Sequence, residues 1–191
     1  MTHTALFGTS ADPPTLGHQS IVEWLAPQFD QVAVWASDNP FKGQQTPFVH
    51  RQAMLALMIE EITRKFSQVQ FAPQLAYPRT LHSVQRARSD FQDSVLVLVV
   101  GSDLVDTLPT WYQAKQLLQW VELLIVSRPG TPIETTNLAA LKALGARFTL
   151  ANFVGPDTSS TAYREGAEQV SVIPAIATYI QQNGLYSEKS R

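Results

Sequence analysis

The stretch GTSADPPTLGH, from Gly8 to His18, lies between a short apolar run, Thr4–Phe7, and a helical pattern, Gly17–Leu25. A polar loop that joins a buried strand to a helix offers phosphate its backbone N–H groups and the positive end of the helix dipole. Glycine carries no Cβ, so Gly8 and Gly17 permit a close approach to the backbone. The stretch contains neither a G-x-G-x-x-G motif nor the G-K-[ST] of a P-loop, which disfavours two common nucleotide-binding folds.

Short apolar runs alternate with longer helical patterns along the rest of the chain. Several runs are apolar on both faces, as in a sheet that helices cover on each side. The alternation predicts an α/β fold: a doubly wound, Rossmann-like parallel sheet with helices on both faces. We expect a single domain over residues 1–191, with a small helical part at its C-terminal end. The predicted strands are Thr4–Phe7, Val32–Ala36, Val69–Phe71, Val95–Val100, Leu123–Ser127 and Arg147–Ala151, and the predicted helices are Gly17–Leu25, Arg51–Phe66, Leu81–Ala87, Gln113–Gln119 and one beginning at Pro174.

The composition narrows the classes of function. The chain has 191 residues, of which 45% are hydrophobic and 16% charged, and a formal net charge of −2. This charge, without a basic stripe, predicts binding to neither nucleic acid nor a membrane surface. The absence of cysteine excludes a disulfide scaffold, thiolate zinc sites and a cysteine nucleophile. The start, MTHTALFGTSADPP, does not look like a secretory signal, and no apolar run approaches the ~20 residues of a membrane span, so we expect a cytoplasmic protein.

Polar residues recur where the pattern predicts helix entrances. Thr15 and His18 stand three residues apart, so both can point toward one anion; the alternative is that Thr15 caps the helix and His18 is an ordinary surface histidine. Farther along, the hydroxyls of Ser159 and Thr161 precede Arg164 and suit a helix N-terminus that holds a triphosphate tail. A hydroxyl cap followed by a solvated arginine is the alternative there.

Two more segments follow the buried run Val95–Val100. Gly101 and Asp103 come directly after it, where a carboxylate can accept hydrogen bonds from ribose hydroxyls or can cap the next turn. Trp111 and Tyr112 then follow a Pro-Thr pair. The tryptophan either belongs to the core or offers a flat face to a heteroaromatic ring.

Four segments resemble the bacterial nicotinate-nucleotide adenylyltransferases, members of the nucleotidylyltransferase superfamily. The TLGH of residues 15–18 is similar to that superfamily's [H/T]-x-G-H motif, and Thr158–Arg164 is similar to its I-S-x-T-x-[IV]-R motif. Gly101–Gly130, which contains GSDLVDTLPTWY and LLIVSRPG, and Ile173–Tyr186 resemble the adenylyltransferase family itself.

The chain departs from the family pattern at several positions. Ala11 stands in the place of an aromatic residue, and Thr15 replaces the first histidine, which leaves His18 as the main charged donor of this loop. Asn39–Lys42 lacks the histidine of the family's N-x-P-P-H-[KR] loop, and Tyr77–Leu81 only loosely resembles its S-Y-T-x-x-T-L segment. The last two segments lie toward the mononucleotide.

The resemblance implies a nucleotidyltransferase that binds ATP and nicotinate mononucleotide. A phosphate oxygen of the mononucleotide would attack the α-phosphorus of ATP in line, and pyrophosphate would leave. Mg²⁺ would be held mainly through the ATP phosphates, without metal ligands from the protein. The residues implied for catalysis are Thr15, His18 and Arg164. Those implied for ATP are Gly8, Thr9, Ser10, His18, Gly101, Asp103, Ser159, Thr161 and Arg164, and those for the mononucleotide are Lys42, Arg51, Thr80, Trp111 and Tyr112, with Trp111 stacking on the pyridine ring.

The sequence is also compatible with other functions. The nearest is a nicotinamide-mononucleotide or dual-specificity adenylyltransferase, because the two substrates differ by an amide in place of a carboxylate. Outside the enzymes, the alternative is a non-catalytic nucleotide-binding protein with the same fold. A homo-oligomer is a further option, since oligomeric state is not readable from this sequence.

Overall fold

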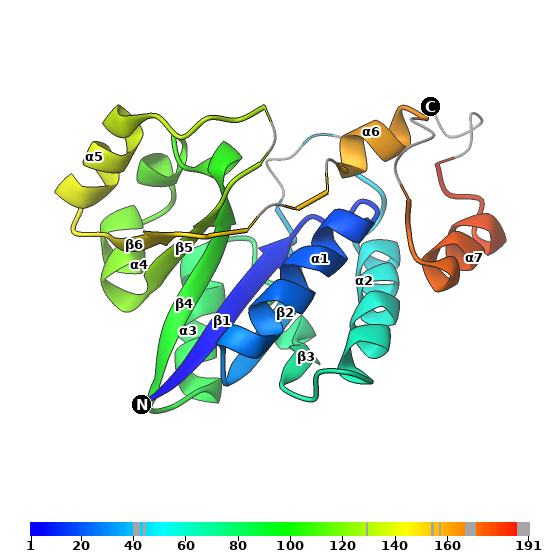
Figure 1. Cartoon of the computed structure of the whole chain (residues 1–191), viewed down its shortest axis with the longest axis horizontal. Helices are drawn as coiled ribbons and strands as arrows, with labels where there is room; N and C mark the ends of the chain where they lie inside the picture. The colour runs from blue at the N-terminus through cyan, green and yellow to red at the C-terminus, as the bar shows by residue number, and fades with distance from the viewer. Residues whose placement is uncertain are drawn as a thin grey trace.

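The computed structural model describes residues 1–39, 43, 45–128, 130–153, 155–156, 158–166 and 171–186. Its centre is a six-stranded sheet in the order β3-β2-β1-β4-β5-β6, in which every pair of neighbouring strands is parallel (Figure 1). The doubly wound sheet expected from the sequence is therefore confirmed. The strands are β1 (Thr2–Thr9), β2 (Gln31–Ala36), β3 (Val69–Phe71), β4 (Ser94–Gly101), β5 (Glu122–Val126) and β6 (Arg147–Leu150).

Helices connect these strands, and each predicted helix is confirmed with ends shifted by three residues or fewer. The α-helices are α1 (Leu16–Leu25), α2 (Phe48–Thr63), α3 (Thr80–Asp90), α4 (Ala114–Trp120), α5 (Thr135–Ala143), α6 (Ser160–Arg164) and α7 (Pro174–Gln182). Short 3₁₀ helices are η1 (Ala26–Gln28), η2 (Pro73–Leu75), η3 (Ser102–Leu104) and η4 (Leu108–Thr110).

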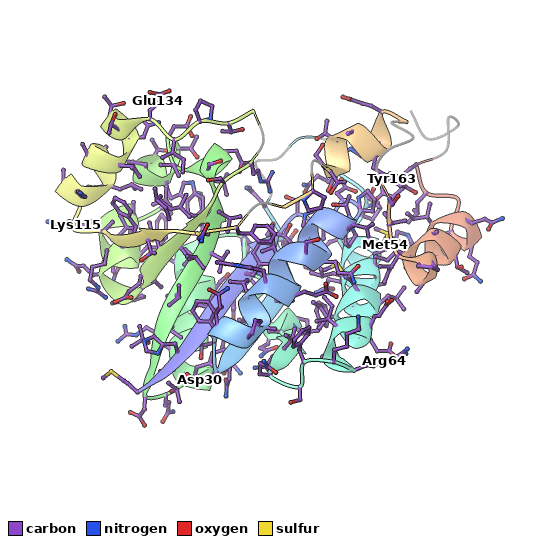
Figure 2. All side chains as sticks on the ribbon, in the orientation of Figure 1. Asp30, Met54, Arg64, Lys115, Glu134 and Tyr163 are labelled. Atoms are coloured by element: carbon purple, nitrogen blue, oxygen red, sulfur yellow. The ribbon has the colours of Figure 1, made fainter. Side chains whose placement is uncertain are left out.

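Two apolar cores lie on opposite faces of the sheet. In β4, Val97 and Val99 pack with side chains of α1, α2 and α7, whereas Leu96, Leu98 and Val100 pack with those of α3, α4 and α5. Figure 2 shows side chains filling the space between the sheet and the helices. Because both faces are covered, the strands are apolar throughout, and this is why they appear in the sequence as continuous runs.

The sequence analysis missed α5, which buries only Leu141. Its segment, TTNLAALKA, therefore lacks the wide apolar stripe by which a surface helix is recognised. None of the helices in the described part of the chain combines the length and hydropathy needed to traverse a bilayer.

The C-terminal part returns to the first half of the chain. Helix α7 begins with Pro174 in its first turn, as predicted, and buries Ile176 and Ile180 in the same core as α1 and α2. The hydroxyl of Tyr179 lies 2.9 Å from Nδ1 of His50 in α2. Figure 1 shows α6 beyond the N-terminal end of α1 and α7 beside α2.

The strand order reverses between β1 and β4. The chain proceeds from β1 to β2 and β3 on one side, and later from β4 to β5 and β6 on the other. Open parallel sheets bind ligands beyond the carboxyl ends of their strands at such a switch point. The loop that follows β1, Ser10–Thr15, and the end of β4 at Gly101 both lie there. The fold thus brings two of the segments predicted to bind ATP to one edge of the sheet.

Replacement of Gly8 tests the packing of β1 against β2. Gly8 pairs with Trp35, and a Cβ at Gly8 would lie 2.7 Å from the Trp35 ring. We predict that Gly8→Ala lowers the free energy of unfolding by about 1–3 kcal/mol, because a crowded core must shift to admit the methyl group. Chemical denaturation measures this change. The control is Gly43→Ala, whose Cβ would meet nothing within 4 Å and should cost less than about 0.5 kcal/mol. Equal stability of the two variants would contradict the prediction.

Candidate active site

Thr15 and His18 form a closed hydrogen-bonded unit at the entrance of α1. Thr15 is the N-cap residue, and its backbone N–H donates to Nδ1 of His18 at 3.1 Å. The Thr15 hydroxyl lies 3.0 Å from the same nitrogen. Thr15 is 1% exposed and His18 9% exposed, so His18 is a buried residue rather than an ordinary surface histidine.

The contact with Thr15 determines which imidazole nitrogen can donate. Nδ1 of His18 accepts the Thr15 N–H, so that nitrogen carries no proton of its own in this arrangement. A neutral imidazole then holds its proton on Nε2. A second proton on Nδ1 would oppose the Thr15 amide, so this geometry favours a neutral His18 as the donor. The sequence had suggested a charged donor.

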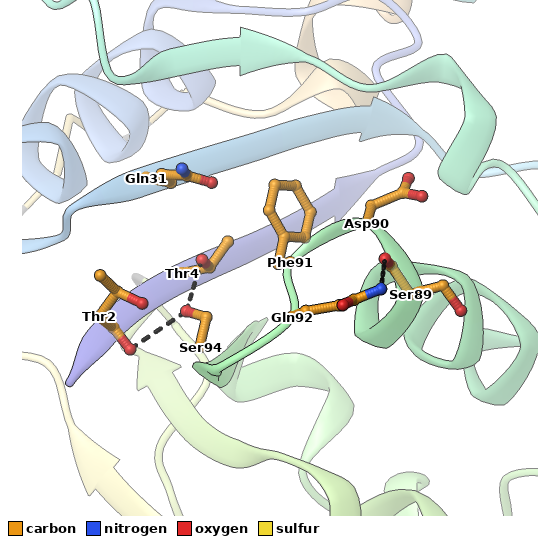
Figure 3. A pocket seen from close by; sticks show the side chains of 8 residues that line it. All are labelled: Thr2, Thr4, Gln31, Ser89, Asp90, Phe91, Gln92 and Ser94. Atoms are coloured by element: carbon orange, nitrogen blue, oxygen red, sulfur yellow. Dashed lines mark hydrogen bonds between the residues drawn. The ribbon is translucent and has the colours of Figure 1, made fainter.

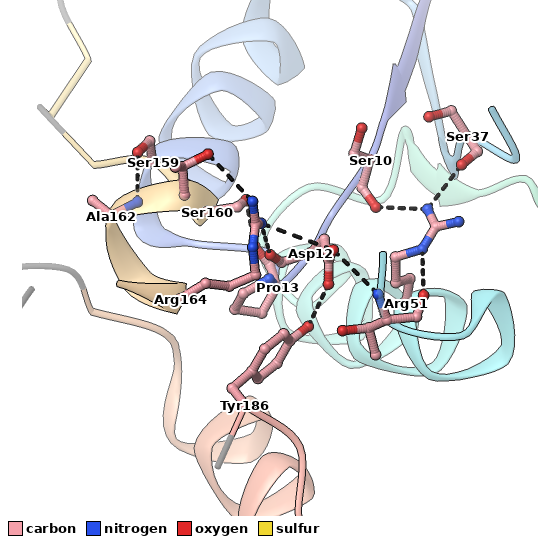
Figure 4. A network of polar contacts seen from close by, with 12 residues as sticks. Ser10, Asp12, Pro13, Ser37, Arg51, Ser159, Ser160, Ala162, Arg164 and Tyr186 are labelled. Atoms are coloured by element: carbon pink, nitrogen blue, oxygen red, sulfur yellow. Dashed lines mark hydrogen bonds and ion pairs between the residues drawn. The ribbon is translucent and has the colours of Figure 1, made fainter. Parts of the chain in front are cut away.

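The segment Thr158–Arg164, which contains the predicted hydroxyls and Arg164, packs directly on the loop that follows β1 (Figure 4). The Ser160 hydroxyl donates to the carbonyl of Pro13 at 2.8 Å, and Nη1 of Arg164 donates to the carbonyl of Asp12 at 2.6 Å. Gly17 completes the contact, since a Cβ there would lie 2.6 Å from Oγ1 of Thr158. The two segments that the sequence separates by about 150 residues therefore share one side of the molecule.

Two hydroxyl groups of the segment Thr158–Arg164 form hydrogen bonds within the short helix α6. The Ser159 hydroxyl accepts the N–H of Ala162 at 3.1 Å and so caps the helix. Oγ1 of Thr161 accepts from Nη2 of Arg164 at 3.3 Å. The capping alternative is thus present, but Arg164 also reaches across to Asp12 instead of only facing solvent.

Asp12 occupies the centre of this network and was not among the predicted site residues. Its side chain is 3% exposed, and its two carboxylate oxygens have separate partners. The Tyr186 hydroxyl donates to Oδ1 at 2.7 Å, and the Thr46 N–H donates to Oδ2 at 3.3 Å. Nη1 of Arg164 lies 3.8 Å from Oδ2. The sequence did contain a signal for Asp12: it is an acidic residue inside a loop that is expected to bind anions. A carboxylate in such a loop needs cationic or N–H partners of its own.

The end of β4 is joined to the end of β5. Asp103 forms an ion pair with Arg128, with Oδ1 3.2 Å from Nε. Oγ of Ser102 accepts the Arg128 N–H at 2.9 Å. Gly101 leaves room for this pair, since a Cβ there would lie 2.8 Å from Nε of Arg128. The sequence analysis overlooked Ser102 and Arg128. Beside the pair is a hollow lined by Ser127, Arg128, Gly130, Thr131, Pro132 and Ile133.

Three of the residues expected at the mononucleotide, Thr80, Trp111 and Tyr112, lie around the start of α3 and the end of η4. Thr80 is the first residue of α3, and the preceding Arg79 lies with its Cζ 5.5 Å from the centre of the Tyr112 ring. The His82 and Tyr112 rings meet edge to face at 5.8 Å. Trp111 is partly buried against the core shared by α3 and α4. Lys42 lies outside the described residues.

Another hollow lies at the opposite edge of the sheet, where the strands begin (Figure 3). Its polar groups largely bond to one another: the hydroxyls of Thr4 and Ser94 are 2.8 Å apart, and Gln92 donates to the carbonyl of Ser89. Ligands of parallel sheets bind beyond the other, carboxyl edge, so this hollow is not the candidate site. It is lined by Thr2, Thr4, Gln31, Ser89, Asp90, Phe91, Gln92 and Ser94.

Known proteins resemble this chain over almost its whole length. Residues 6–166 match the cytidylyltransferase-like family, and a probable nicotinate-nucleotide adenylyltransferase of Synechocystis sp. is 42% identical over 96% of this chain and 98% of the relative. The chain belongs to the nicotinate-nucleotide adenylyltransferase family. The nicotinate-nucleotide adenylyltransferase of Bacillus subtilis is 26% identical over 97% of this chain and 99% of the relative. The family resemblance drawn from the four sequence segments is confirmed.

Solved structures of nicotinate-nucleotide adenylyltransferases share the fold. The nicotinic acid mononucleotide adenylyltransferase of Plasmodium falciparum, in complex with NaAD, aligns with a TM-score of 0.81 at 18% identity. The alignment covers 97% of this chain and 98% of that one. The same protein in complex with APC gives a TM-score of 0.79. At such low identity the agreement concerns the fold, namely the doubly wound sheet with its C-terminal helical part.

Arg51 was expected at the mononucleotide phosphate of a nicotinate-nucleotide adenylyltransferase, but the structure places it among backbone carbonyls. It is 3% exposed, its Nε donates to the carbonyl of Thr46 at 3.0 Å, and Nη1 donates to those of Ser10 and Ser37 at 2.9 and 2.8 Å (Figure 4). Burial lowers the pKa of Arg51, whereas Asp12 raises it. This placement favours a structural role, in which Arg51 joins three backbone segments.

Thr9 and Ser10 contribute to this junction through their main chain. The carbonyl of Thr9 accepts the Ser37 N–H at 2.7 Å, and the carbonyl of Ser10 accepts from Arg51. Both residues therefore hold the loop after β1 against the end of β2. They lie at the expected edge of the sheet, and these contacts involve backbone atoms.

We predict that Arg51→Lys lowers the free energy of unfolding by about 2–4 kcal/mol. Lysine keeps the charge, but its ammonium group cannot reach all three carbonyls as the planar guanidinium does, so buried acceptors lose their donors. Denaturant titration measures the loss. Arg64→Lys is the control at the end of the same helix, where the side chain is 72% exposed, and should change stability by less than about 0.5 kcal/mol. A similar small effect at Arg51 would show that the three contacts are dispensable.

Proposed function

We propose that this protein transfers AMP from ATP to nicotinate mononucleotide, giving deamido-NAD and pyrophosphate. One observation carries the proposal: α6 packs on the loop after β1, so that Arg164 and the Thr15–His18 unit lie on the same side of the switch point. Membership of the nicotinate-nucleotide adenylyltransferase family supports the choice of substrates.

The reaction needs positioning and charge stabilisation rather than a side-chain nucleophile. A phosphate oxygen of the mononucleotide attacks the α-phosphorus of ATP, the bond from that phosphorus to the bridging oxygen breaks, and pyrophosphate departs with the electron pair. His18 donates from Nε2 to oxygens of the α- and β-phosphates, and Thr15 holds its ring in that tautomer. Ser159, Thr161 and Arg164 bind the β- and γ-phosphates at the start of α6.

Mg²⁺ belongs to the same proposal. The described residues contain no group of three or more His, Cys, Asp or Glu arranged to hold a metal ion. A Mg²⁺ ion bound through phosphate oxygens and water fits this surrounding, because it needs few protein ligands. When bound, it neutralises part of the charge that develops on the phosphates.

The mononucleotide half of the site involves Thr80, Trp111 and Tyr112, with Gly101 and Asp103 toward the ribose of ATP. Asp103 and Arg128 are paired, and the carboxylate keeps a second oxygen for a ribose hydroxyl. A contribution of Lys42 to the mononucleotide half and a cytoplasmic location belong to the same proposal.

An assay of pyrophosphate and dinucleotide formation tests the function. ATP is supplied with nicotinate mononucleotide, nicotinamide mononucleotide or neither, and kcat/KM is compared for the two acceptors. We expect the larger value with nicotinate mononucleotide. Equal values indicate a dual-specificity enzyme, and no product with either acceptor supports the non-catalytic alternative.

In that assay we predict that His18→Ala lowers kcat by about 100-fold or more, because removal of one preorganised donor to developing charge costs about 10²–10³ in rate. The fold should survive, since the helix entrance keeps the Thr15 cap. His3→Ala is the control: His3 is exposed near the start of β1, away from the carboxyl edge, and should leave kcat unchanged. Normal turnover by folded His18→Ala would refute the assignment.

We predict that Trp111→Ala raises KM for the mononucleotide with little change in KM for ATP, because a stacked ring contributes only to binding of the pyridine. Trp111 also packs on the core, so the folded fraction is measured in parallel. Trp120→Ala, which removes another partly buried tryptophan from the same core, is the control for loss of packing. Equal losses for both substrates would count against stacking.

A further inference from the structure

The last described residues of the chain end in a contact with the loop after β1. After α7, the backbone turns at Gly184 and places Tyr186 so that its hydroxyl donates to Oδ1 of Asp12 at 2.7 Å. The two residues are 174 positions apart in the sequence. Figure 4 shows Tyr186 reaching from the C-terminal segment to Asp12, with Arg164 on one side of Asp12 and Arg51 on the other.

The conformation of Tyr186 is unusual for a bulky residue. Its φ is +60°, in the left-handed region that side chains with a Cβ rarely adopt. Such a conformation persists where surrounding contacts determine it. Here the Tyr186 ring meets the Tyr163 ring of α6 edge to face, with centroids 5.8 Å apart and planes at 84°. The ring is thus held between α6 and the loop, with its hydroxyl directed at Asp12.

The chemistry of the contact is also defined. Burial raises the pKa of Tyr186 well above its ordinary value, so the hydroxyl stays protonated and acts as a donor. An ionised carboxylate only accepts hydrogen bonds. Tyr186 therefore occupies Oδ1 of Asp12, and the other oxygen faces the Thr46 N–H and Arg164.

We propose that Tyr186 is a positioning residue for ATP: its hydroxyl sets the orientation of the Asp12 carboxylate, and Asp12 in turn holds the Arg164 guanidinium toward the phosphates. The inference rests on the proposed function for the identity of the ligand. It adds to that function a C-terminal residue that touches no substrate. Without the hydroxyl, Oδ1 is buried without its donor, and the carboxylate turns toward other partners. Arg164 then keeps its contacts with the Asp12 carbonyl and Thr161 but loses the ion pair that fixes its direction.

The test compares Tyr186→Phe with Tyr179→Phe. Both remove one phenolic hydroxyl from the C-terminal part, but the Tyr179 hydroxyl contacts His50 in α2 instead of Asp12. For Tyr186→Phe we expect KM for ATP to rise about tenfold, as for loss of a hydrogen bond to a charged group, with KM for the mononucleotide changed less than about twofold. Tyr179→Phe should leave both KM values unchanged. Calorimetric titration with ATP alone should report the same tenfold loss of affinity.

A double-mutant cycle tests whether the effect passes through Arg164. In an Arg164→Ala background, Tyr186→Phe should no longer alter ATP affinity, because the group that it positions is absent. Asp12→Asn provides a variant independent of Tyr186: it keeps an acceptor oxygen but loses the charge that attracts Arg164, and should also weaken ATP binding. This second variant keeps the test decisive if Tyr186→Phe does not fold.

Three outcomes would overturn the proposal: a lowered melting temperature with unchanged ATP affinity in Tyr186→Phe, additive effects of Tyr186→Phe and Arg164→Ala, or normal ATP affinity in Asp12→Asn. A wild-type protein that binds ATP but forms no dinucleotide would instead contradict the proposed function. The calorimetric comparison of variants needs no turnover, so the two failures are distinguishable.

Discussion

The pairing of β1 with β2 on one side and with β4 on the other is the interaction on which the rest of the structure depends. All three strands are parallel, so each must be followed by a crossover that covers a face of the sheet. The connection that follows β1 runs to one side, to β2, whereas the connection that follows β4 runs to the other side, to β5. The two connections diverge and leave a gap between them at the carboxyl edge of the sheet. Open parallel sheets bind ligands at such a gap, and here it contains the loop after β1 and the entrance of α1, where we propose that ATP binds.

Charge at this gap is balanced within the protein. Asp12 is buried in the loop after β1, and burial of a carboxylate is costly unless donors and cations surround it. Arg164, Tyr186 and the Thr46 N–H come from three other parts of the chain and meet that need. The loop, α6 and the C-terminal segment therefore hold one another. The proposed phosphate site is therefore preorganised before any ligand arrives, which is the condition for electrostatic stabilisation.

The family and the fold could be recognised from the sequence because their signals are local. Buried parallel strands appear as continuous apolar runs, and the motifs at His18 and Arg164 are short. Helix α5 escaped recognition because it buries only Leu141 and so carries little periodic signal. Arg51 was expected at a phosphate, whereas in the structure its guanidinium donates to three backbone carbonyls. The sequence does not distinguish an arginine that binds carbonyls from one that binds a ligand.

The order of elements, the class of fold and the residue types at the phosphate loop follow from the chain alone, because periodicity and short motifs depend on neighbours in sequence. The partners of Asp12, the tautomer of His18 and the ion pair of Asp103 with Arg128 do not. The contacts of Asp12 and Asp103 join residues far apart along the chain, and the tautomer of His18 depends on the three-dimensional geometry of the helix entrance. Hydrophobic patterns encode none of these. Only folding into three dimensions decides which donor faces which acceptor, and with it which side chains remain for a substrate.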